Sequence, residues 1–136
     1  MIEEAKVLIA DDDDDFRELL RGYLSDEGYR TVEAKDGSEV LNKIIDEKPD
    51  IVLLDVMMPS KNGFDVCRDI KNDRRTRGSA VVMLTVKNSL TDKLSGYVVG
   101  AQRYLCKPCE MEEIKDCLQS VLKRKRMNDI QIDRDV

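Results

Sequence analysis

The feature that most constrains this fold is a regular alternation of short apolar segments with segments of helical periodicity. Five segments rich in aliphatic and β-branched residues lie at residues 6–10, 29–34, 51–54, 80–84 and 103–105. After each one, apolar residues recur three or four positions apart, which is typical of helices. Strands that alternate with helices form parallel sheets. We therefore expect an α/β fold: a five-stranded doubly wound parallel sheet with helices on both faces.

The length of 136 residues suits a single domain. Lys123-Arg124-Lys125-Arg126 follows the last apolar residue of the final expected helix, where cations favour a helix C-terminus. We expect residues 1–126 to form the domain and residues 127–136 to form a C-terminal tail or the start of a linker. A stand-alone domain and a domain followed by an effector are both compatible with the sequence.

Charge and composition narrow the classes of function. The net charge of −5 argues against direct nucleic-acid binding, which needs a basic face. Histidine is absent, which removes the commonest general base and zinc ligand. No apolar run approaches the ~20 residues of a membrane span, and the first four residues include two acids, unlike a secretory signal. We expect a cytoplasmic protein without membrane contact.

Polar residues stand at the carboxyl ends of four of the expected strands. Asp11 and Asp12 follow the first strand, Asp55 follows the third, Thr85 ends the fourth and Lys107 follows the fifth. In open α/β sheets, functional groups gather at this edge. The five side chains are therefore expected to converge, although each alone could be a capping, turn or surface residue.

Three carboxylates at one edge require a proton or a cation. Two of them about 4 Å apart repel by roughly 4 kcal/mol at an effective dielectric constant of ~20. Oxygen ligands without histidine favour Mg²⁺, which commonly shares its coordination with a phosphate. Because aspartate can also act as a nucleophile toward phosphorus, the set predicts phosphoryl transfer.

Four cysteines complete the candidate reactive residues: Cys67, Cys106, Cys109 and Cys117. The CxxC spacing of Cys106 and Cys109 leaves a redox or zinc site open. A redox site favours a cysteine at a helix N-terminus, and a zinc site needs four ligands. Cys106 ends an expected strand and no second CxxC exists, so free thiols are the preferred interpretation.

Five ordered motifs resemble the receiver domain of two-component response regulators, including single-domain chemotaxis regulators. The motifs are VLIADD at residues 7–12, DIVLLDVMMP at 50–59 with Gly63, VMLT at 82–85, Gly100-Ala101, and YLCKP at 104–108. The resemblance extends from residue 5 to about residue 124. It implies the flavodoxin-like receiver fold.

The resemblance assigns roles to the residues at the strand ends. Asp55 would accept the phosphoryl group. Mg²⁺ would be bound directly by Asp12 and Asp55, mainly through water by Asp11, and by the backbone carbonyl of Met57. Lys107 would pair with the phosphoryl group, and the Lys107-Pro108 peptide bond would be cis.

The family's switch is implied as well. Thr85 would swing to the phosphoryl group, and Tyr104 would rotate inward in response. The surface of the fourth helix, fifth strand and fifth helix would then be read by an effector that the sequence does not identify. The phosphoryl donor would be a sensor histidine kinase or a histidine phosphotransfer protein. Such a chain is not an enzyme beyond its own phosphorylation and slow dephosphorylation.

Three residues match positions that tune the lifetime of the phosphoryl group in this family: Met57, Val86 and Lys87. An apolar Met57 and a donor at Lys87 offer an attacking water no acceptor, and Val86 adds bulk. We expect a long-lived phosphoryl group.

Two other classes remain as alternatives. A Mg²⁺-dependent phosphatase of the haloacid dehalogenase type also uses an aspartyl nucleophile, but it places a second aspartate two residues later, where this chain has Met57. A flavodoxin-like FMN protein would need a phosphate-binding loop after the first strand, where the aspartate run of residues 11–15 would repel a phosphate.

Overall fold

The computed structural model describes residues 4–135 and contains one five-stranded sheet. The strand order is β2-β1-β3-β4-β5, and every neighbouring pair is parallel. The strands are β1 (Lys6–Ala10), β2 (Arg30–Ala34), β3 (Ile51–Leu54), β4 (Ala80–Thr85) and β5 (Arg103–Cys106). All five expected strands are confirmed, with small differences at their ends, and so is the doubly wound topology.

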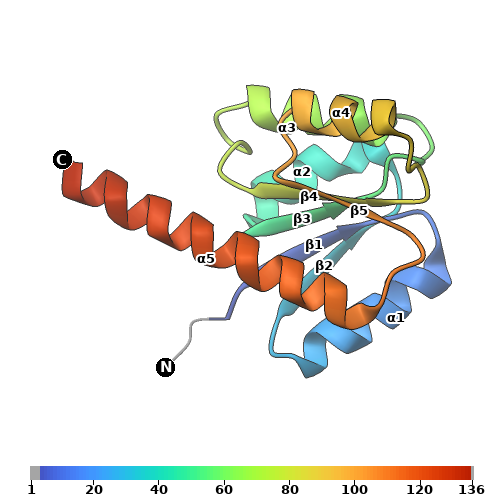
Figure 1. Ribbon diagram of the computed structural model, residues 1–136, viewed down its shortest axis with the longest axis horizontal. Coiled ribbons are helices and arrows are strands. Elements are labelled where there is room, and N and C mark those ends of the chain that lie inside the picture. Colours follow the sequence, from blue (N-terminus) through green and yellow to red (C-terminus); the bar gives the residue numbers. More distant parts are fainter. Residues whose placement is uncertain (1–3, 136) are drawn as a thin grey trace.

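Five α-helices cover both faces of the sheet, as expected (Figure 1). They are α1 (Asp14–Asp26), α2 (Val40–Glu47), α3 (Gly63–Asn72), α4 (Leu90–Val98) and α5 (Met111–Asp135), with a short 3₁₀ turn, η1 (Gly37–Glu39), before α2. Helices α1 and α5 pack on one face, and α2, α3 and α4 lie on the other.

The central strands are buried on both faces, which explains their unbroken apolar sequence. All four residues of β3 and all six of β4 are buried. Alternate residues of these strands contribute to two separate core layers: Val52 and Leu54 face α2 and α3, whereas Ile51 and Leu53 face α1 and α5. A sheet packed this way holds its strand ends, and the residues that follow them, in fixed positions.

Side-chain caps define where two helices begin. The Asp13 carboxylate accepts a hydrogen bond from the Phe16 N–H and caps α1. Ser89 and Asp92 form a reciprocal capping box at the start of α4. These caps set where the loops beyond β1 and β4 end.

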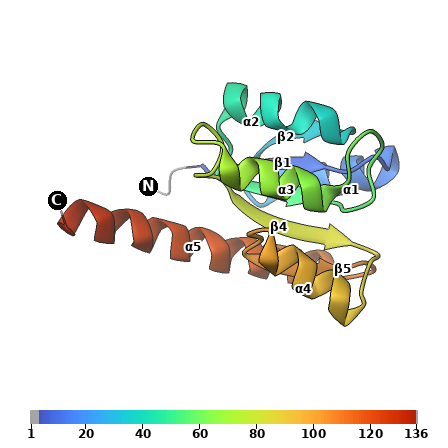
Figure 2. The ribbon, with the colours of Figure 1, turned by 90° about the horizontal axis from the view of Figure 1, so that it is seen from above.

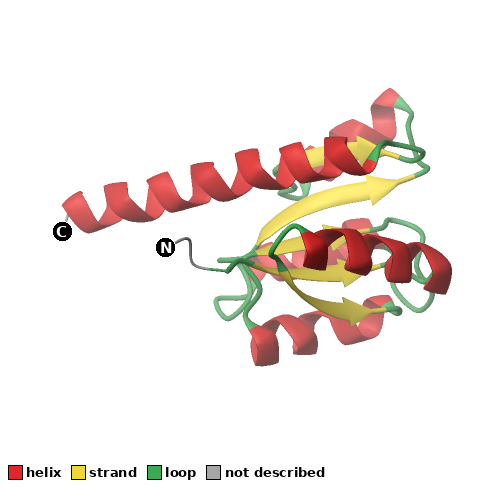
Figure 3. Cartoon of the chain, turned by 90° about the horizontal axis from the view of Figure 1, so that it is seen from below, coloured by secondary structure: helices red, strands yellow, loops and turns green. Residues whose placement is uncertain are grey.

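Helix α5 is longer than the sequence pattern predicts. It continues from Met111 to Asp135, so residues 127–135, expected as a tail or the start of a linker, extend the helix. Viewed from above and from below, its C-terminal part projects past the edge of the sheet (Figures 2 and 3). A helix can itself begin a linker, so the boundary at residue 126 stays a prediction. Within residues 4–135, no helix combines the length and apolar character needed to span a membrane.

Candidate functional site

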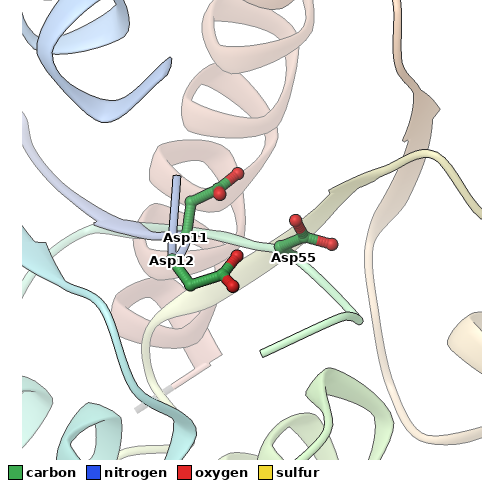
Figure 4. Close-up of side chains that lie close together, drawn as sticks. All are labelled: Asp11, Asp12 and Asp55. Carbon is green, nitrogen blue, oxygen red and sulfur yellow. The ribbon is translucent and has the colours of Figure 1, made fainter. Parts of the chain in front are cut away.

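Three carboxylates meet at the carboxyl edge of the sheet, as the sequence predicts. Asp11 and Asp12 follow β1, and Asp55 follows β3, the strand that pairs with β1 (Figure 4). Each offers one carboxylate oxygen, and these oxygens lie within 4.8 Å of one another. Asp11 and Asp55 are buried, whereas Asp12 is exposed. The cluster therefore has a buried base and one side chain open to solvent.

Lys107 bridges the two buried carboxylates. Its Nζ lies 2.5 Å from Asp11 Oδ2 and 3.2 Å from Asp55 Oδ2. The lysine directly follows β5, and the Lys107-Pro108 peptide bond after it is cis, as the sequence resemblance implies. Three carboxylates and one ammonium leave a net charge of −2, which a divalent cation would neutralise. Hard oxygen ligands suit Mg²⁺, so the residues present fit this ion.

Burial acts in opposite directions on the charged groups of the cluster. It raises the pKa of Asp11, because a buried carboxylate loses hydration; hydrogen bonds from Lys107 and from the Asp13 N–H only partly offset this. For Lys107, burial alone would lower the pKa, but the hydrogen bonds and charges of Asp11 and Asp55 outweigh it and raise the pKa. Lys107 therefore stays protonated and offsets part of the repulsion.

The Asp55 carboxylate is held in place from the backbone side. Its Oδ1 accepts a hydrogen bond from the Met57 N–H at 3.0 Å, while its Oδ2 faces Lys107. The loop after β3 folds back so that the Gly63 N–H donates to the Val56 carbonyl at 2.8 Å. Each carboxylate oxygen has about two lone-pair directions, so these contacts leave positions free for a further bond.

Thr85 and Tyr104 are connected through one residue, Lys87. Thr85 is fully buried at the end of β4, and its Oγ1 accepts a hydrogen bond from the Lys87 N–H at 3.4 Å. The Tyr104 hydroxyl donates to the Lys87 carbonyl at 2.7 Å. Tyr104 thus occupies an inward position in this structure, with only 9% of its surface exposed.

An open cavity of about 550 Å³ lies beside the carboxylates. Met57 and Lys87, two of the three lifetime-tuning candidates, line it together with the exposed Asp12. Val86, the third candidate, does not belong to the lining and is 56% exposed. The structure therefore places Met57 and Lys87 in the wall of the cavity beside the carboxylates and Val86 outside it.

The cysteines do not join a metal-binding group. Within residues 4–135, Asp11, Asp12 and Asp55 are the one set of three potential ligands whose atoms lie close together. All four cysteines are free thiols. Burial raises the pKa of Cys67 to about 11 and also raises the pKa of Cys109 and Cys117, which disfavours their thiolate forms. The free-thiol interpretation of Cys106 and Cys109 stays a prediction.

One contact of the site was not expected from the sequence. The Lys107 ammonium lies 4.1 Å from the centroid of the Phe16 ring, a cation–π contact. In the sequence, Phe16 is the first apolar residue of a helical pattern, which predicts only a core position. Its place directly after a strand-end acidic run is the one signal that could have pointed to the site.

Comparisons with known proteins agree with this geometry. The profile of the response regulator receiver domain matches residues 7–119. The probable transcriptional regulator ycf27 of Guillardia theta is 40% identical over 119 residues, which cover 88% of this chain and 46% of that protein. The transcriptional regulatory protein ResD of Bacillus subtilis is 36% identical over 121 residues, covering 89% and 49%. The chain spans about half the length of the curated relatives it matches.

Solved structures show the same fold over nearly their whole length. The chemotaxis response regulator CheY4 of Vibrio cholerae superimposes with a TM-score of 0.82 at 34% identity, covering 88% of this chain and 99% of that one. A CheY-like receiver domain protein of Methanospirillum hungatei gives a TM-score of 0.87 at 25% identity, covering 93% and 99%. None of these relatives supports the haloacid dehalogenase alternative. With a profile match over most of its length, the chain belongs to the response regulator receiver domain family of two-component signalling.

Proposed function

We propose that the domain accepts a phosphoryl group on Asp55 in a Mg²⁺-dependent reaction. The observation that carries the proposal is the bridge from Lys107 to both Asp11 and Asp55 beside the exposed Asp12. The Asp55 carboxylate, proposed as the nucleophile, thus lies beside the Lys107 ammonium and beside carboxylate oxygens that suit a hard metal ion. Phosphoryl transfer needs this combination, because its catalysis consists mostly of positioning and charge neutralisation.

The carboxylates of the cluster differ in how readily they can bind a metal ion directly. Both carboxylate oxygens of Asp11 are engaged, one by Lys107 and the other by the Asp13 N–H at 3.0 Å. Asp12 is exposed and lines the open cavity, so it is the better direct ligand. The oxygens of Asp55 are engaged as well, by Lys107 and the Met57 N–H, and we assign it as the second direct ligand from the family resemblance. We assign Asp11 to contact through water and add the Met57 carbonyl as a further ligand. When bound, Mg²⁺ supplies the charge that neutralises phosphoryl oxygens.

In the transfer step, an Asp55 oxygen forms a bond to phosphorus as the bond from phosphorus to the donor's histidine nitrogen breaks. Lys107 can move with the transferred group and pair with one of its oxygens. The Thr85 hydroxyl can turn from the Lys87 N–H and donate to another oxygen. The donor is a sensor histidine kinase or a histidine phosphotransfer protein, and the protein acts in the cytoplasm as a switch rather than as an enzyme.

The phosphorylated state would be read at the face of α4, β5 and α5. Four large apolar residues of α4 are more than or about half exposed: Leu90 (73%), Leu94 (55%), Tyr97 (50%) and Val98 (84%). Their spacing places them on one side of the helix. An exposed apolar stripe of this kind suits a downstream protein, although its identity is not encoded in this surface.

The direct test is phosphorylation by a small acyl phosphate with Mg²⁺, followed by intact mass measurement. The wild-type chain should gain one phosphoryl group. Asp55→Asn should fold and remain unmodified, and omission of Mg²⁺ should abolish the gain. Labelling of Asp55→Asn at another aspartate would overturn the assignment, whereas turnover of a generic phosphomonoester would point to a phosphatase instead.

A further inference from the structure

Helix α4 contacts the sheet through a residue without a side chain. Gly96 is the only buried residue of α4, whose nine residues are all described. Its four large apolar residues, Leu90, Leu94, Tyr97 and Val98, point to the other side of the helix and are exposed. The packing of α4 on the core therefore depends largely on the atoms that lie beneath Gly96.

The ring of Tyr104 fills the space beneath Gly96. A β carbon built on Gly96 would lie 2.7 Å from Tyr104 Cδ2 and 3.0 Å from Cε2, but an unstrained 3.7 Å from Met83 Cγ. Carbon atoms normally approach only to about 3.5 Å. No backbone atom blocks the position, and Gly96 is not among the residues with a positive φ. Alanine would therefore fit the backbone of α4 and conflict with the tyrosine ring alone.

The same ring links α4 to the phosphoryl site. The Tyr104 hydroxyl donates to the Lys87 carbonyl, and the Lys87 N–H donates to Thr85 Oγ1. A side chain that turned the ring outward would break the bond to Lys87 and release the loop between β4 and α4. Because Tyr104 can swing as a unit, the conflict would be relieved by moving the ring rather than by unfolding the helix.

We propose that Gly96 is a positioning residue for Tyr104: its missing side chain admits the ring beneath α4 and sets how readily the tyrosine takes the inward position. This inference deepens the proposed function, on which its consequence for the phosphoryl site rests. The steric part concerns only the packing of α4 on β5. Glycine otherwise weakens a helix interior relative to alanine, so its presence here needs a packing reason.

A double-mutant cycle in thermal unfolding tests the steric part. In the wild-type background, Gly96→Ala should lower the melting temperature. In a Tyr104→Ala background the conflict is absent, and Gly96→Ala should raise the melting temperature by about 3 °C through helix propensity. Gly22→Ala is the matched control: Gly22 lies within α1, and its added β carbon meets no atom within 4 Å. It should stabilise both backgrounds equally.

One result of the double-mutant cycle would contradict the proposal. If Gly96→Ala changes the melting temperature by the same amount in both backgrounds, Gly96 does not act through Tyr104 and the proposal is wrong. This test needs no phosphorylation, so it remains decisive even if Asp55 accepts no phosphoryl group.

The link to the site is tested with beryllofluoride, a stable mimic of the phosphoryl group, in the presence of Mg²⁺. Gly96→Ala retains every residue of the acidic cluster, yet its affinity for the mimic should fall about fivefold or more, the usual size of coupling between two sites. Gly22→Ala should bind like the wild type. Unchanged affinity of Gly96→Ala would overturn the link, and failure of the wild type to bind would overturn the proposed function itself.

Discussion

Lys107 makes three contacts, and each stabilises its ammonium in a different way. Asp11 and Asp55 offer carboxylate oxygens at 2.5 and 3.2 Å, and the Phe16 ring offers its electron-rich face at 4.1 Å. The two carboxylates would repel each other without it. A fixed lysine therefore offsets the repulsion between the buried carboxylates of Asp11 and Asp55.

Because the pKa of Asp11 is raised, we expect the stabilisation of the fold by Mg²⁺ to depend on pH. Its pKa is raised by burial, so the folded state holds a proton on this carboxyl more readily than the unfolded chain does. That contribution to stability is complete below the ordinary pKa of 3.8 and is lost as the pH rises through the folded-state pKa. Mg²⁺ can replace the lost proton, so its shift of the melting temperature should grow as the pH rises from 3.8 toward neutrality.

Calorimetry or circular dichroism with and without Mg²⁺ measures this dependence. At 100 times its dissociation constant, the ion should stabilise the wild type by roughly 2.7 kcal/mol. Asp12→Ala should lose most of the shift, and Asp11→Asn should lose its dependence on pH in this range. A shift of equal size at both ends of the range would argue against a proton on Asp11 that competes with the metal.

We expect Met57 to slow the loss of the phosphoryl group from Asp55. Its side chain lines the cavity beside Asp55 and offers an attacking water no hydrogen-bond acceptor. Met57→Asn introduces one, and a hydrogen bond of about 1 kcal/mol should accelerate the loss roughly fivefold. Val86→Ala provides the comparison, because Val86 lies outside the cavity lining and should matter less. Decay followed after rapid removal of the phosphoryl donor gives both rates; unchanged rates would exclude control by these side chains.

The strand-end residues could be predicted from the sequence because parallel strands bring their ends together whatever the details of packing. Asp11, Asp55 and Lys107 stand one or two residues after buried apolar runs, and the structure brings all three within contact distance. The ring of Phe16 beside Lys107 could not be predicted in this way. Its position depends on the angle at which α1 leaves the sheet, which no periodicity encodes.

At the scale of elements, the loop from β3 to α3 leaves no room for a methyl group at Gly63. A β carbon built on Gly63 would lie 2.4 Å from the Asp55 carbonyl oxygen and 2.7 Å from Val56 Cα, both rigid backbone atoms. Gly63→Ala must therefore shift the start of α3 away from the acceptor. We expect destabilisation of about 1–3 kcal/mol, typical of overpacking, and slower phosphorylation of Asp55.

Urea unfolding and acyl phosphate labelling check both parts of this prediction. Gly78→Ala is the matched control, because its β carbon meets no atom within 4 Å and Gly78 lies in another loop. It should leave stability and labelling close to those of the wild type. Equal behaviour of the two variants would show that the loop can absorb the extra carbon.

The elements also show where sequence periodicity stops being informative. The residues of α4 follow a helical pattern, and the helix forms from Leu90 to Val98. Ordinarily such an apolar stripe faces the core. Here Gly96 faces the core and the stripe is exposed, because the ring of Tyr104 already occupies the space next to the sheet. The orientation of a helix with a stripe on one side and a glycine on the other depends on tertiary contacts.

At the scale of the whole molecule, opposite charges gather at opposite ends of the sheet. The three carboxylates lie beyond the carboxyl ends of β1 and β3. At the other end, Arg103, Arg124 and Lys125 line a cavity of about 310 Å³ between β5 and α5. The basic run at residues 123–126 thus lies just before the part of α5 that projects past the sheet.

The length of α5 bears on where the folded domain ends. Among residues 111–128, the part of α5 whose burial is described, the last buried residue is Val121, and residues 123–128 are exposed or half-buried. The matched profile likewise ends at residue 119. If the domain ends near residue 126, removal of residues 127–136 deletes no core contact and should change the melting temperature by less than about 2 °C. Phosphorylation of Asp55 should remain as in the full chain.

A shorter chain that ends at Cys117 is the contrasting variant. It lacks Leu118 and Val121, both buried against α1 and the sheet, and loss of such side chains costs about 2–5 kcal/mol each. Its melting temperature should therefore fall by many degrees, while the chain that ends at residue 126 stays close to the full length. If removal of residues 127–136 is as damaging as the deeper truncation, the projecting part of α5 belongs to the folded domain, and the boundary must be placed beyond it.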